Sequence, residues 1–327
     1  MSFIDPGASF TQKLIGITVQ LANNPGTNQP STFAEGSVPG QIAGGNTVTL
    51  SNSRTSVRIW NSGTFLQTAT IKVWGLTPSL MNQLNTLGIV YNIVAKNTVT
   101  ITAGDNINGM PAVFSGTIWS ASGDYKSLPD VPFILECNGI LASAIAPVSA
   151  AGFKGWTNVA TIMSGMARQA GFGFQNFGVT GQLYNPHFRG TTNQQIDTCA
   201  RHSGTMYSTA NNVLAIWPKG SSQSAGLSIP IISPAYGMIA SPQLTPQGIV
   251  VDTLFNPLIG YGGLVQVQSE VLSGVLSAQS AANPTFNAPA NGIWAVNKLD
   301  HALDSLVRNG QWKSTVYAWN PNYPKPV

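Results

Sequence analysis

Short alternating segments dominate the first 128 residues of the chain. Gly, Asn and Pro separate segments in which apolar and polar positions alternate, namely LIGITVQLA, GNTVTLSNS, TSVRIW, ATIKVWGL, YNIVAKNTVTITAG and AVFSGTIWSAS. A period of two with many Val, Ile and Thr residues is typical of strands that bury one face. Many short strands at this spacing predict a β-sandwich or small barrel over residues 1–128.

One short helix is predicted within these strands. Thr77 is a suitable N-cap, and Pro78 suits the first helical position because its fixed φ matches the helix. In the following SLMNQLNTLG, three leucines fall on one side of the helix before a glycine ends it: Leu80, Leu84, Leu87 and Gly88.

The hydrophobic period changes from two to that of helices within residues 151–220. The first helix expected there lies between Trp156 and Gly171, with Thr157 or Asn158 as its N-cap. Its apolar face consists of Val159, Ile162, Met163, Met166 and Ala170. Residues 151–220 are therefore predicted to form a compact α/β insert.

A second helix is predicted in the insert from Thr192 to His202. A strand pair follows it, and Asn211-Asn212 makes the turn because Asn tolerates the left-handed region. Residues 129–150, which precede the insert, have a strand-like pattern.

Strand patterns resume in residues 221–327. The stretch from Gly237 to Val267 predicts turn, strand, turn and strand, with IVVDTLF and LVQVQSEV as the alternating segments. One more helix is predicted from Asn297 to Arg308. The fold class that follows is mainly β with an α+β insert.

Charged residues are scarce, at 8% of the chain where about 25% is usual, while 43% of the residues are hydrophobic. A membrane protein, a secreted β-rich protein and a subunit that hides surface in an assembly all have such compositions. A membrane span is not expected, because the longest weakly polar run, from Gly139 to Gly152, contains Pro147 and falls short of about 20 apolar residues.

The N-terminal sequence has Asp5 and Pro6 before any basic residue and lacks the apolar core of a signal peptide, so export by that route is not expected. The cysteines Cys137 and Cys199 have no redox or metal spacing. We expect them to be reduced and buried, as in a protein made in cytosol.

The net charge of +4 does not by itself predict nucleic-acid binding. No run of Lys or Arg follows a phosphate backbone, and Arg54 and Arg58 are interpreted as a solvated strand face. Sequence-specific nucleic-acid binding is therefore not predicted.

No catalytic, cofactor or metal residues are predicted. HExxH, CxxC, GxxxxGK[ST] and GxSxG motifs are absent, and the glycines of GFGFQNFG follow a helix, whereas a phosphate loop precedes one. Cys199 and His202, with Asp197 and His187 nearby, offer fewer soft or imidazole ligands than the four a zinc site usually has. Whether Cys199 and His202 have any ligand role stays open.

Paired carboxylates would indicate a glycosidase. The glutamates Glu35, Glu136 and Glu270 are scattered, and Asp300 with Asp304 occupies adjacent turns of a predicted helix, although pairing through the fold stays open. The eight tryptophans are interpreted as core or subunit contacts, with a sugar-stacking platform as the alternative.

Several motifs occur in the order found in the baseplate hub proteins of contractile-tailed bacteriophages, a family related in fold to the base of type VI secretion spikes. The chain resembles that family through ATIKVWGL with the SLMNQLNTLG helix, FSGTIWSAS, LAIWPKG, IISPAYGMIASPQLTPQGIVVDTLFNP, WAVNKLDH (Trp294 to His301) and the closing WKST (Trp312 to Thr315). The resemblance covers nearly the whole chain with loose motifs.

The resemblance implies two tube-like β domains per chain, with the second one discontinuous over residues 129–150 and 221–327. It implies a homotrimer whose six β domains form a ring that joins the sixfold tail tube to the threefold central spike and lets the genome pass. The partners implied are a tail tube or tube-initiator protein, the spike and other baseplate subunits, in a virion assembled in host cytoplasm.

The same resemblance implies a structural protein without enzymatic activity, and a hydrogen-bonding role for His301. Sheets that continue across subunits would also account for the few charges, because their edges need no protective lysines. The alternatives are another tail-tip adaptor protein and a β-rich tail enzyme that degrades cell wall.

Overall fold

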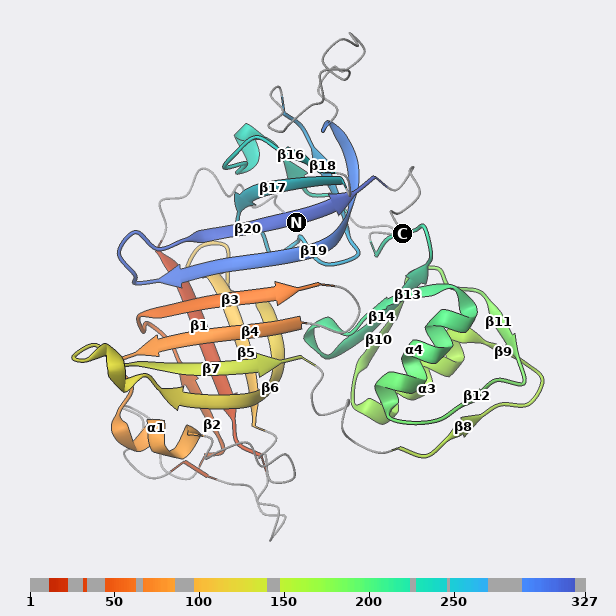
Figure 1. The fold of residues 1–327 in the computed structure, drawn as a ribbon, viewed down its shortest axis with the longest axis horizontal. Helices are drawn as coiled ribbons and strands as arrows, with labels where there is room; N and C mark the ends of the chain where they lie inside the picture. The colour runs from red at the N-terminus through yellow and green to blue at the C-terminus, as the bar shows by residue number, and fades with distance from the viewer. Residues whose placement is uncertain are drawn as a thin grey trace.

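The computed structural model describes residues 12–22, 32–33, 45–62, 67–85, 97–139, 148–223, 228–245, 248–269 and 290–320. Within them, a 13-stranded sheet extends through most of the molecule, and an α/β insert lies beside it (Figure 1). This confirms the mainly β fold class. No helix among these residues has the length and apolar character needed to span a bilayer.

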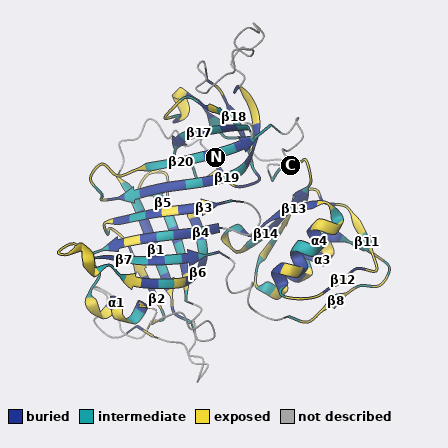
Figure 2. Ribbon diagram, in the orientation of Figure 1, coloured by how far each residue is buried: buried dark blue, intermediate teal, exposed yellow. Residues whose placement is uncertain are grey.

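The N-terminal part of the sheet is called the first β unit. It contains β1 (Lys13–Gln20), β2 (Thr47–Leu50), β3 (Thr55–Asn61), β4 (Gln67–Trp74), β5 (Thr98–Asp105), β6 (Ala112–Gly123) and β7 (Pro132–Asn138), with α1 (Pro78–Leu84) and the short η1 (Tyr125–Ser127). The strands lie in the order β3-β4-β7-β6-β5-β1-β2, and all neighbours are antiparallel. Buried and more exposed residues alternate along them (Figure 2).

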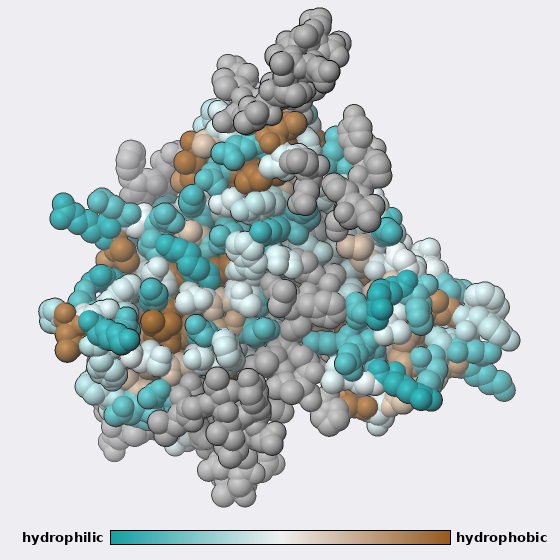
Figure 3. Space-filling model, in the orientation of Figure 1, coloured by the Kyte–Doolittle hydropathy of each residue, from teal (hydrophilic) through white to brown (hydrophobic). Residues whose placement is uncertain are grey.

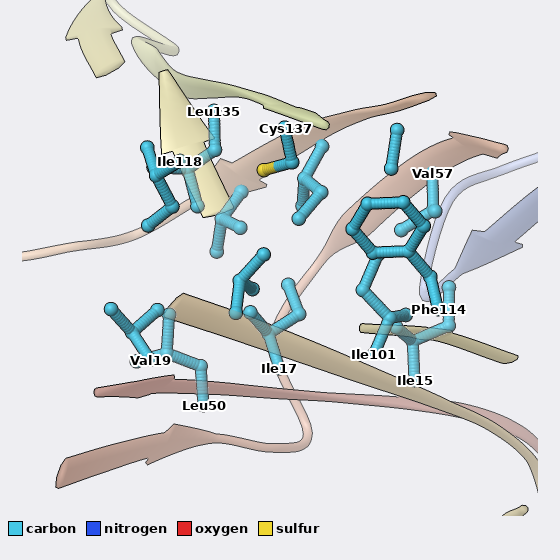
Figure 4. Packing of buried hydrophobic residues seen from close by; sticks show 14 of the residues in the cluster. Ile15, Ile17, Val19, Leu50, Val57, Ile101, Phe114, Ile118, Leu135 and Cys137 are labelled. Carbon is cyan, nitrogen blue, oxygen red and sulfur yellow. The ribbon is translucent and has the colours of Figure 1, made fainter. Parts of the chain in front are cut away.

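The first core lies between the two halves of this folded sheet. Side chains of Ile17 and Val19 from β1 face those of Ile118 and Cys137 from β6 and β7 (Figure 4). Phe114 and Phe133 are fully buried, and burial of such a side chain contributes about 1.5–3 kcal/mol. The alternation of apolar and polar positions seen in the sequence therefore supplies the side chains of this core.

Helix α1 begins where the sequence predicted. The Thr77 hydroxyl accepts a hydrogen bond from the Leu80 amide, and Pro78 is the first helical residue. Leu80 and Leu84 are buried in the first core. The helix ends at Leu84, whereas the predicted Leu87 and Gly88 lie outside the described residues.

Strand β7 corrects one part of the expected domain organisation. The resemblance assigned residues 129–150 to the second β domain, but β7 lies between β4 and β6 of the first β unit. Phe133, Leu135 and Cys137 are buried in the first core. Residues 140–147 of the same segment lie outside the described part of the chain.

The C-terminal part of the sheet is called the second β unit. It contains β15 (Ile231–Ile232), η3 (Pro234–Tyr236), β16 (Gln243–Thr245), β17 (Gly248–Leu254), β18 (Leu264–Val267), β19 (Gly292–Ser305) and β20 (Trp312–Trp319). The main path runs β16-β17-β20-β19, and β18 pairs with β19 and with β15. A separate core includes Val251, Val265, Val316 and Trp294. The strands predicted between Gly237 and Val267 are confirmed as β17 and β18.

The helix predicted from Asn297 to Arg308 is wrong, because most of this segment belongs to the long strand β19. Leu299, Ala302 and Leu303 have a spacing that also fits a helix. In the structure, Leu299, His301, Leu303 and Ser305 point inward at a period of two, and β20 and β3 pair with the strand on its two sides. Tertiary pairing thus overrides the local helical pattern.

The insert has its own core. Its elements are β8 (Ala151–Gly152), β9 (Trp156–Asn158), α3 (Val159–Ala170), β10 (Gly173–Asn176), β11 (Gln182–Tyr184), β12 (His187–Phe188), α4 (Thr192–Ser203), β13 (Thr205–Ser208), η2 (Ala210–Asn212) and β14 (Val213–Pro218). The two helices pack on the β10-β14-β13 sheet through residues such as Ile162, Met163, Ile196, Leu214 and Ile216.

The predicted helix boundaries and turn of the insert are confirmed. The Asn158 side chain caps α3 by accepting the Ala160 amide at 2.8 Å, and Gly171 ends this helix in the left-handed conformation. Strands β13 and β14 are antiparallel. Asn211 and Asn212 between them have φ values of 54° and 60°, as the Asn-Asn turn predicted.

Candidate functional site

Strand β19 joins the two β units into one hydrogen-bonded sheet. Its residues 299–305 pair with residues 55–61 of β3, while its other side pairs with β20. Ser56 donates a hydrogen bond to Asp304 at 2.6 Å across this join, although the two residues lie 248 positions apart. The join between the units is therefore a continuous backbone ladder.

Buried aromatic rings hold the inner side of the join. The Phe255 ring lies edge-on to His301, with 5.3 Å between ring centroids, and edge-on to Trp312 at 5.6 Å. Phe255 and Leu303 belong to the second β unit, yet both are buried in the first core. The two units therefore share apolar packing as well as hydrogen bonds.

His301 is buried at this join, and its Nδ1 lies 2.7 Å from the Ser314 hydroxyl oxygen. Burial lowers the pKa of His301 to about 4, because the charged imidazolium would lose its hydration. The ring is therefore neutral near pH 7. It packs against Phe255 and forms a hydrogen bond, which is the role that the family resemblance implied.

The outer side of the join carries charged and aromatic residues and is called the junction face: Arg58, Trp60, Asp252, Lys298, Asp300, Asp304, Lys313 and Tyr317. The Lys298 ammonium lies 3.9 Å from the Trp60 ring centroid and 4.5 Å from that of Tyr317. It thereby links β19 to β3 and β20 by cation–π contacts.

Ion pairs connect neighbouring strands on the junction face. Arg58 donates to Asp304 at 3.0 Å, and Lys313 donates to Asp252 at 3.0 Å. Burial raises the pKa of Asp304, but hydrogen bonds from Arg58, Ser56 and the Gln311 amide outweigh burial and lower that pKa overall. Burial raises the pKa of Asp300 despite the nearby cations.

Two carboxylates of this face form cross-strand ion pairs, Asp304 with Arg58 and Asp252 with Lys313. Asp300 and Asp304, which the sequence placed on a helix, lie on the outward face of β19. A glycosidase holds two carboxyl groups across a substrate groove. The cavity of about 270 Å³ between the β units and the insert is lined by Asn61, Gln67, Gln175, Asn211 and His301 among others, without a carboxylate among its described lining residues.

The structure does not bring the metal-ligand candidates together. Cys199 is buried in the insert core, and burial raises the pKa of its thiol to about 12. His202 is exposed on the same helix, and Asp197 pairs with Arg201 at 2.8 Å. No group of three or more His, Cys, Asp or Glu residues suited to a metal ion occurs in the described part of the chain.

The remaining candidates have individual contacts. Arg54 pairs with Asp130, and its guanidinium stacks 4.4 Å above the Trp74 ring centroid. Cys137 is buried in the first core, and Glu136 lies beside it on β7. Glu35 and Glu270 lie outside the described residues.

The tryptophans serve several different contacts. Trp217 packs edge-on against Tyr261, with 6.1 Å between ring centroids, and joins the insert to the second β unit. Trp294 is buried in the second core and donates to the Ala290 carbonyl at 2.8 Å. Trp156, by contrast, is exposed on the insert.

Sequence reasoning missed how charge is distributed along the chain. Residues 151–220 contain five basic residues and one acid, whereas the rest of the chain has ten basic and ten acidic residues. The whole net charge of +4 therefore lies in the insert. The basic residues are Lys154, Arg168, Arg189, Arg201 and Lys219, and the acid is Asp197.

Three solved structures share the fold. A tail protein from Neisseria meningitidis MC58 aligns with a TM-score of 0.57 at 8% identity, covering 93% of this chain and 96% of that one. The 43 kDa tail protein of prophage MuSo2 from Shewanella oneidensis aligns with a TM-score of 0.54 at 9% identity. This alignment covers 94% of this chain and 97% of that one. A component of the Escherichia coli type VI secretion system aligns with a TM-score of 0.52 at 10% identity, covering 84% of this chain and 76% of that one. That component is described as structurally similar to the phage T4 tail proteins gp27 and gp5.

Sequence comparison assigns the family. No curated protein matches the chain. The family model described as "Baseplate hub gp41" matches residues 42–309, a span that contains the join between the β units and the whole insert. With tail proteins among the structures that share its fold, the chain belongs to the baseplate hub gp41 family of phage-tail structural proteins.

Proposed function

We propose that this protein is the structural hub of a phage baseplate and acts as a homotrimer. The trimer joins a sixfold tail tube to a threefold central spike and leaves an axial passage for the genome. The observation that carries the proposal is the β19–β3 ladder, which fuses two β units within one chain. The family assignment supports the setting.

The number of β units in the chain fits a change from sixfold to threefold symmetry. Three copies of a chain with two β units present six such units in a ring, together with three inserts. One side of such an assembly matches sixfold symmetry and the other matches threefold symmetry. Closed rings of this kind need a head-to-tail contact that repeats from copy to copy.

The end strands of the sheet are the candidates for that contact. Within the described residues, β2 and β16 stand at the two ends of the main strand order. Strands at a sheet edge readily pair with another chain unless charges or prolines block them. Pairing between copies would extend the sheet in the way that the β19–β3 ladder extends it within one chain.

The partners that fit this role are a tail tube or tube-initiator protein, a central spike and other baseplate subunits. The place of action is the virion, after assembly in host cytoplasm. The low charge content of 8% fits a chain that covers much of its surface with partners. We infer that the protein performs no enzymatic reaction.

Light scattering over a concentration series tests the proposal. A trimer has three times the chain mass of 34.4 kDa, and association is expected to strengthen with concentration. The double variant Gln243→Lys with Thr245→Lys places two charges on β16 and is expected to weaken the trimer at least tenfold. The matched control, Thr161→Lys with Gln169→Lys on exposed positions of α3, should leave the trimer intact. A monomer at every concentration, with or without lytic activity on cell wall, would contradict the hub.

A further inference from the structure

The insert carries a two-stranded ribbon with two different faces. Strand β9 pairs with β11, and β8 pairs with β12, so residues 151–158 lie antiparallel to residues 182–188. The inner face packs on the insert core through Ala151, Phe153, Leu183 and Phe188. The outer ribbon face consists of the exposed residues Lys154, Trp156, Tyr184, His187 and Arg189.

Two large rings stand side by side on the outer ribbon face. Trp156 and Tyr184 are directly opposite each other in the β9–β11 pair, and their ring centroids lie 5.2 Å apart. They are 69% and 62% exposed, although aromatic side chains of this size are usually buried in cores or interfaces. Figure 3 shows that the visible surface of the insert is largely hydrophilic, with a few scattered hydrophobic residues.

The backbone beneath the rings is fixed before any partner arrives. The Gly155 amide donates to the Asn185 side chain at 2.6 Å, and the Asn185 amide donates to the Gly155 carbonyl at 2.9 Å. Gly155 and Asn185 both have positive φ, which suits the tight crossing. Trp and Tyr side chains have few rotatable bonds and lose little conformational entropy when they bind, so two of them on a fixed backbone are suited to anchor a partner.

Basic residues flank the rings, and the outer ribbon face contains no acid. Arg189 donates to His187 Nε2 at 3.0 Å, and Lys154 has no ion pair among the described residues. Aromatic rings together with Arg are the residues that dominate protein–protein hot spots. We propose that the outer ribbon face docks an acidic segment of a different protein, with Trp156 and Tyr184 as anchors.

A second copy of this chain is a poor occupant, because most of its described acids already have partners. Ion pairs engage Asp105, Asp130, Asp197, Asp252 and Asp304. Asp124 accepts hydrogen bonds from the Lys126 amide and the Ser127 hydroxyl. The chain outside the insert has no net charge with which to attract the insert. Charge complementarity therefore favours another protein.

Nucleic acid also fits less well. A protein that holds a phosphate backbone typically makes about 6–10 contacts with phosphates, whereas Lys154 and Arg189 are the Lys and Arg residues of this face. A protein hot spot requires only a few anchors with charged residues around them. The inference that the acidic partner is a tail protein rests on the proposed function, but the chemistry of the face does not.

Binding of a labelled acidic peptide tests the chemistry on the purified protein. The probe is a fluorescein-labelled synthetic peptide with the repeat Asp-Leu-Glu-Gly, and fluorescence anisotropy at low salt reports its affinity. We expect saturable binding that falls at least tenfold in Trp156→Ala with Tyr184→Ala and in Lys154→Glu with Arg189→Glu. The matched control, Arg168→Glu with Lys219→Glu, makes the same change in net charge outside the ribbon. Its affinity for the peptide should stay within twofold of that of the unmodified protein.

Several outcomes would overturn the proposal. The first is failure of the peptide to bind, and the second is an equal loss of peptide affinity in the two charge-reversal variants. The third is binding of a labelled oligo-dT through the same residues with higher affinity than the peptide. Circular dichroism of each variant confirms that the exposed substitutions leave the fold intact.

Photo-cross-linking in purified phage particles identifies the partner class. A benzophenone amino acid at position 184 should form an adduct with a different tail protein, at a peptide rich in Asp or Glu, and one at position 169 should not. Adducts with copies of this chain, with DNA, or with nothing would contradict the inference. Absence of the chain from the particles would overturn the proposed hub function instead. The peptide-binding measurement would then be the sole test of whether the outer ribbon face binds an acidic segment.

Discussion

The ammonium group of Lys298 lies 3.9 Å from the ring centroid of Trp60, so a side chain of the second β unit rests on a ring of the first. The contact sits directly above the β19–β3 ladder, in which Asp300 is opposite Trp60. It covers the backbone join on the junction face. Its loss should therefore affect the stability of both units together.

Removing this contact should lower the free energy of unfolding. An exposed cation–π contact contributes about 0.5–1 kcal/mol. We therefore expect Lys298→Met to lower the free energy of unfolding by that amount, since methionine keeps an apolar side chain at this position. Trp60→Ala should lose about 1–2 kcal/mol because it also removes apolar packing. Denaturant unfolding of both variants and of the double variant gives the coupling energy. Strictly additive losses would show that the two residues do not interact.

Gly262→Ala should weaken the attachment of the insert. Gly262 has a φ of 77°, and an added Cβ would lie 2.6 Å from Cζ2 of Trp217. We expect the free energy of unfolding to fall by roughly 1–3 kcal/mol, because the substitution strains the backbone and displaces the Trp217 ring. Limited proteolysis should show faster cleavage between the insert and the β units.

Gly165→Ala is the matched control for that experiment. Gly165 lies within α3, and beyond its chain neighbours and the backbone of its own helix nothing lies within 4 Å of an added Cβ. The alanine should stabilise the helix by about 0.5–1 kcal/mol. Equal proteolysis of the two variants would contradict the role assigned to Gly262.

Acid should destabilise the protein through His301. Its pKa is lowered to about 4 in the folded chain, against about 6.5 in the unfolded chain. Between these pH values the unfolded chain binds more protons, so stability falls as the pH falls. The contribution is at most about 1.4 kcal/mol per pH unit, or roughly 3 kcal/mol over the interval.

A comparison with His301→Gln isolates this contribution from the carboxylates. The variant should be less stable near pH 7, because it loses the ring contact with Phe255. Its stability should nevertheless change less between pH 6.5 and pH 4 than that of the native chain. Parallel pH profiles from chemical denaturation would contradict the prediction.

Both cysteine thiols should be inert in the folded protein. Burial raises the pKa of Cys199 to about 12 and raises that of Cys137 well above its usual range, and the thiolate is the reactive form. We expect a thiol reagent such as DTNB to label them only on unfolding. The variants Cys137→Ala and Cys199→Ala assign the two signals, and rapid labelling of either one in the native protein would disprove its burial.

Elements with local signals were predictable from the sequence. Thr77-Pro78 marked the start of α1, Asn158 and Gly171 marked the ends of α3, and Asn211-Asn212 marked the turn between β13 and β14. In each case the side chain or the φ value of the named residue determines the structure within a few positions of the chain.

Elements that depend on distant partners were not predictable in the same way. The Leu299, Ala302 and Leu303 spacing fits a helix, and only pairing with β3 and β20 makes the segment a strand. The place of β7 between β4 and β6 likewise follows from register between distant segments. The Lys298–Trp60 contact has no sequence signal, whereas the basic character of the insert could have been read by comparing charges among segments.

The long separation between the paired strands affects how the nascent chain folds. Strand β3 leaves the ribosome long before the β19 residues that cover its edge are synthesised, as the pair Ile59 and His301 shows. Until then β3 presents an uncovered edge that can capture other strands. A chain that ends before β19 would keep that edge open and would tend to aggregate, so only chains translated through the β19–β20 hairpin cover it.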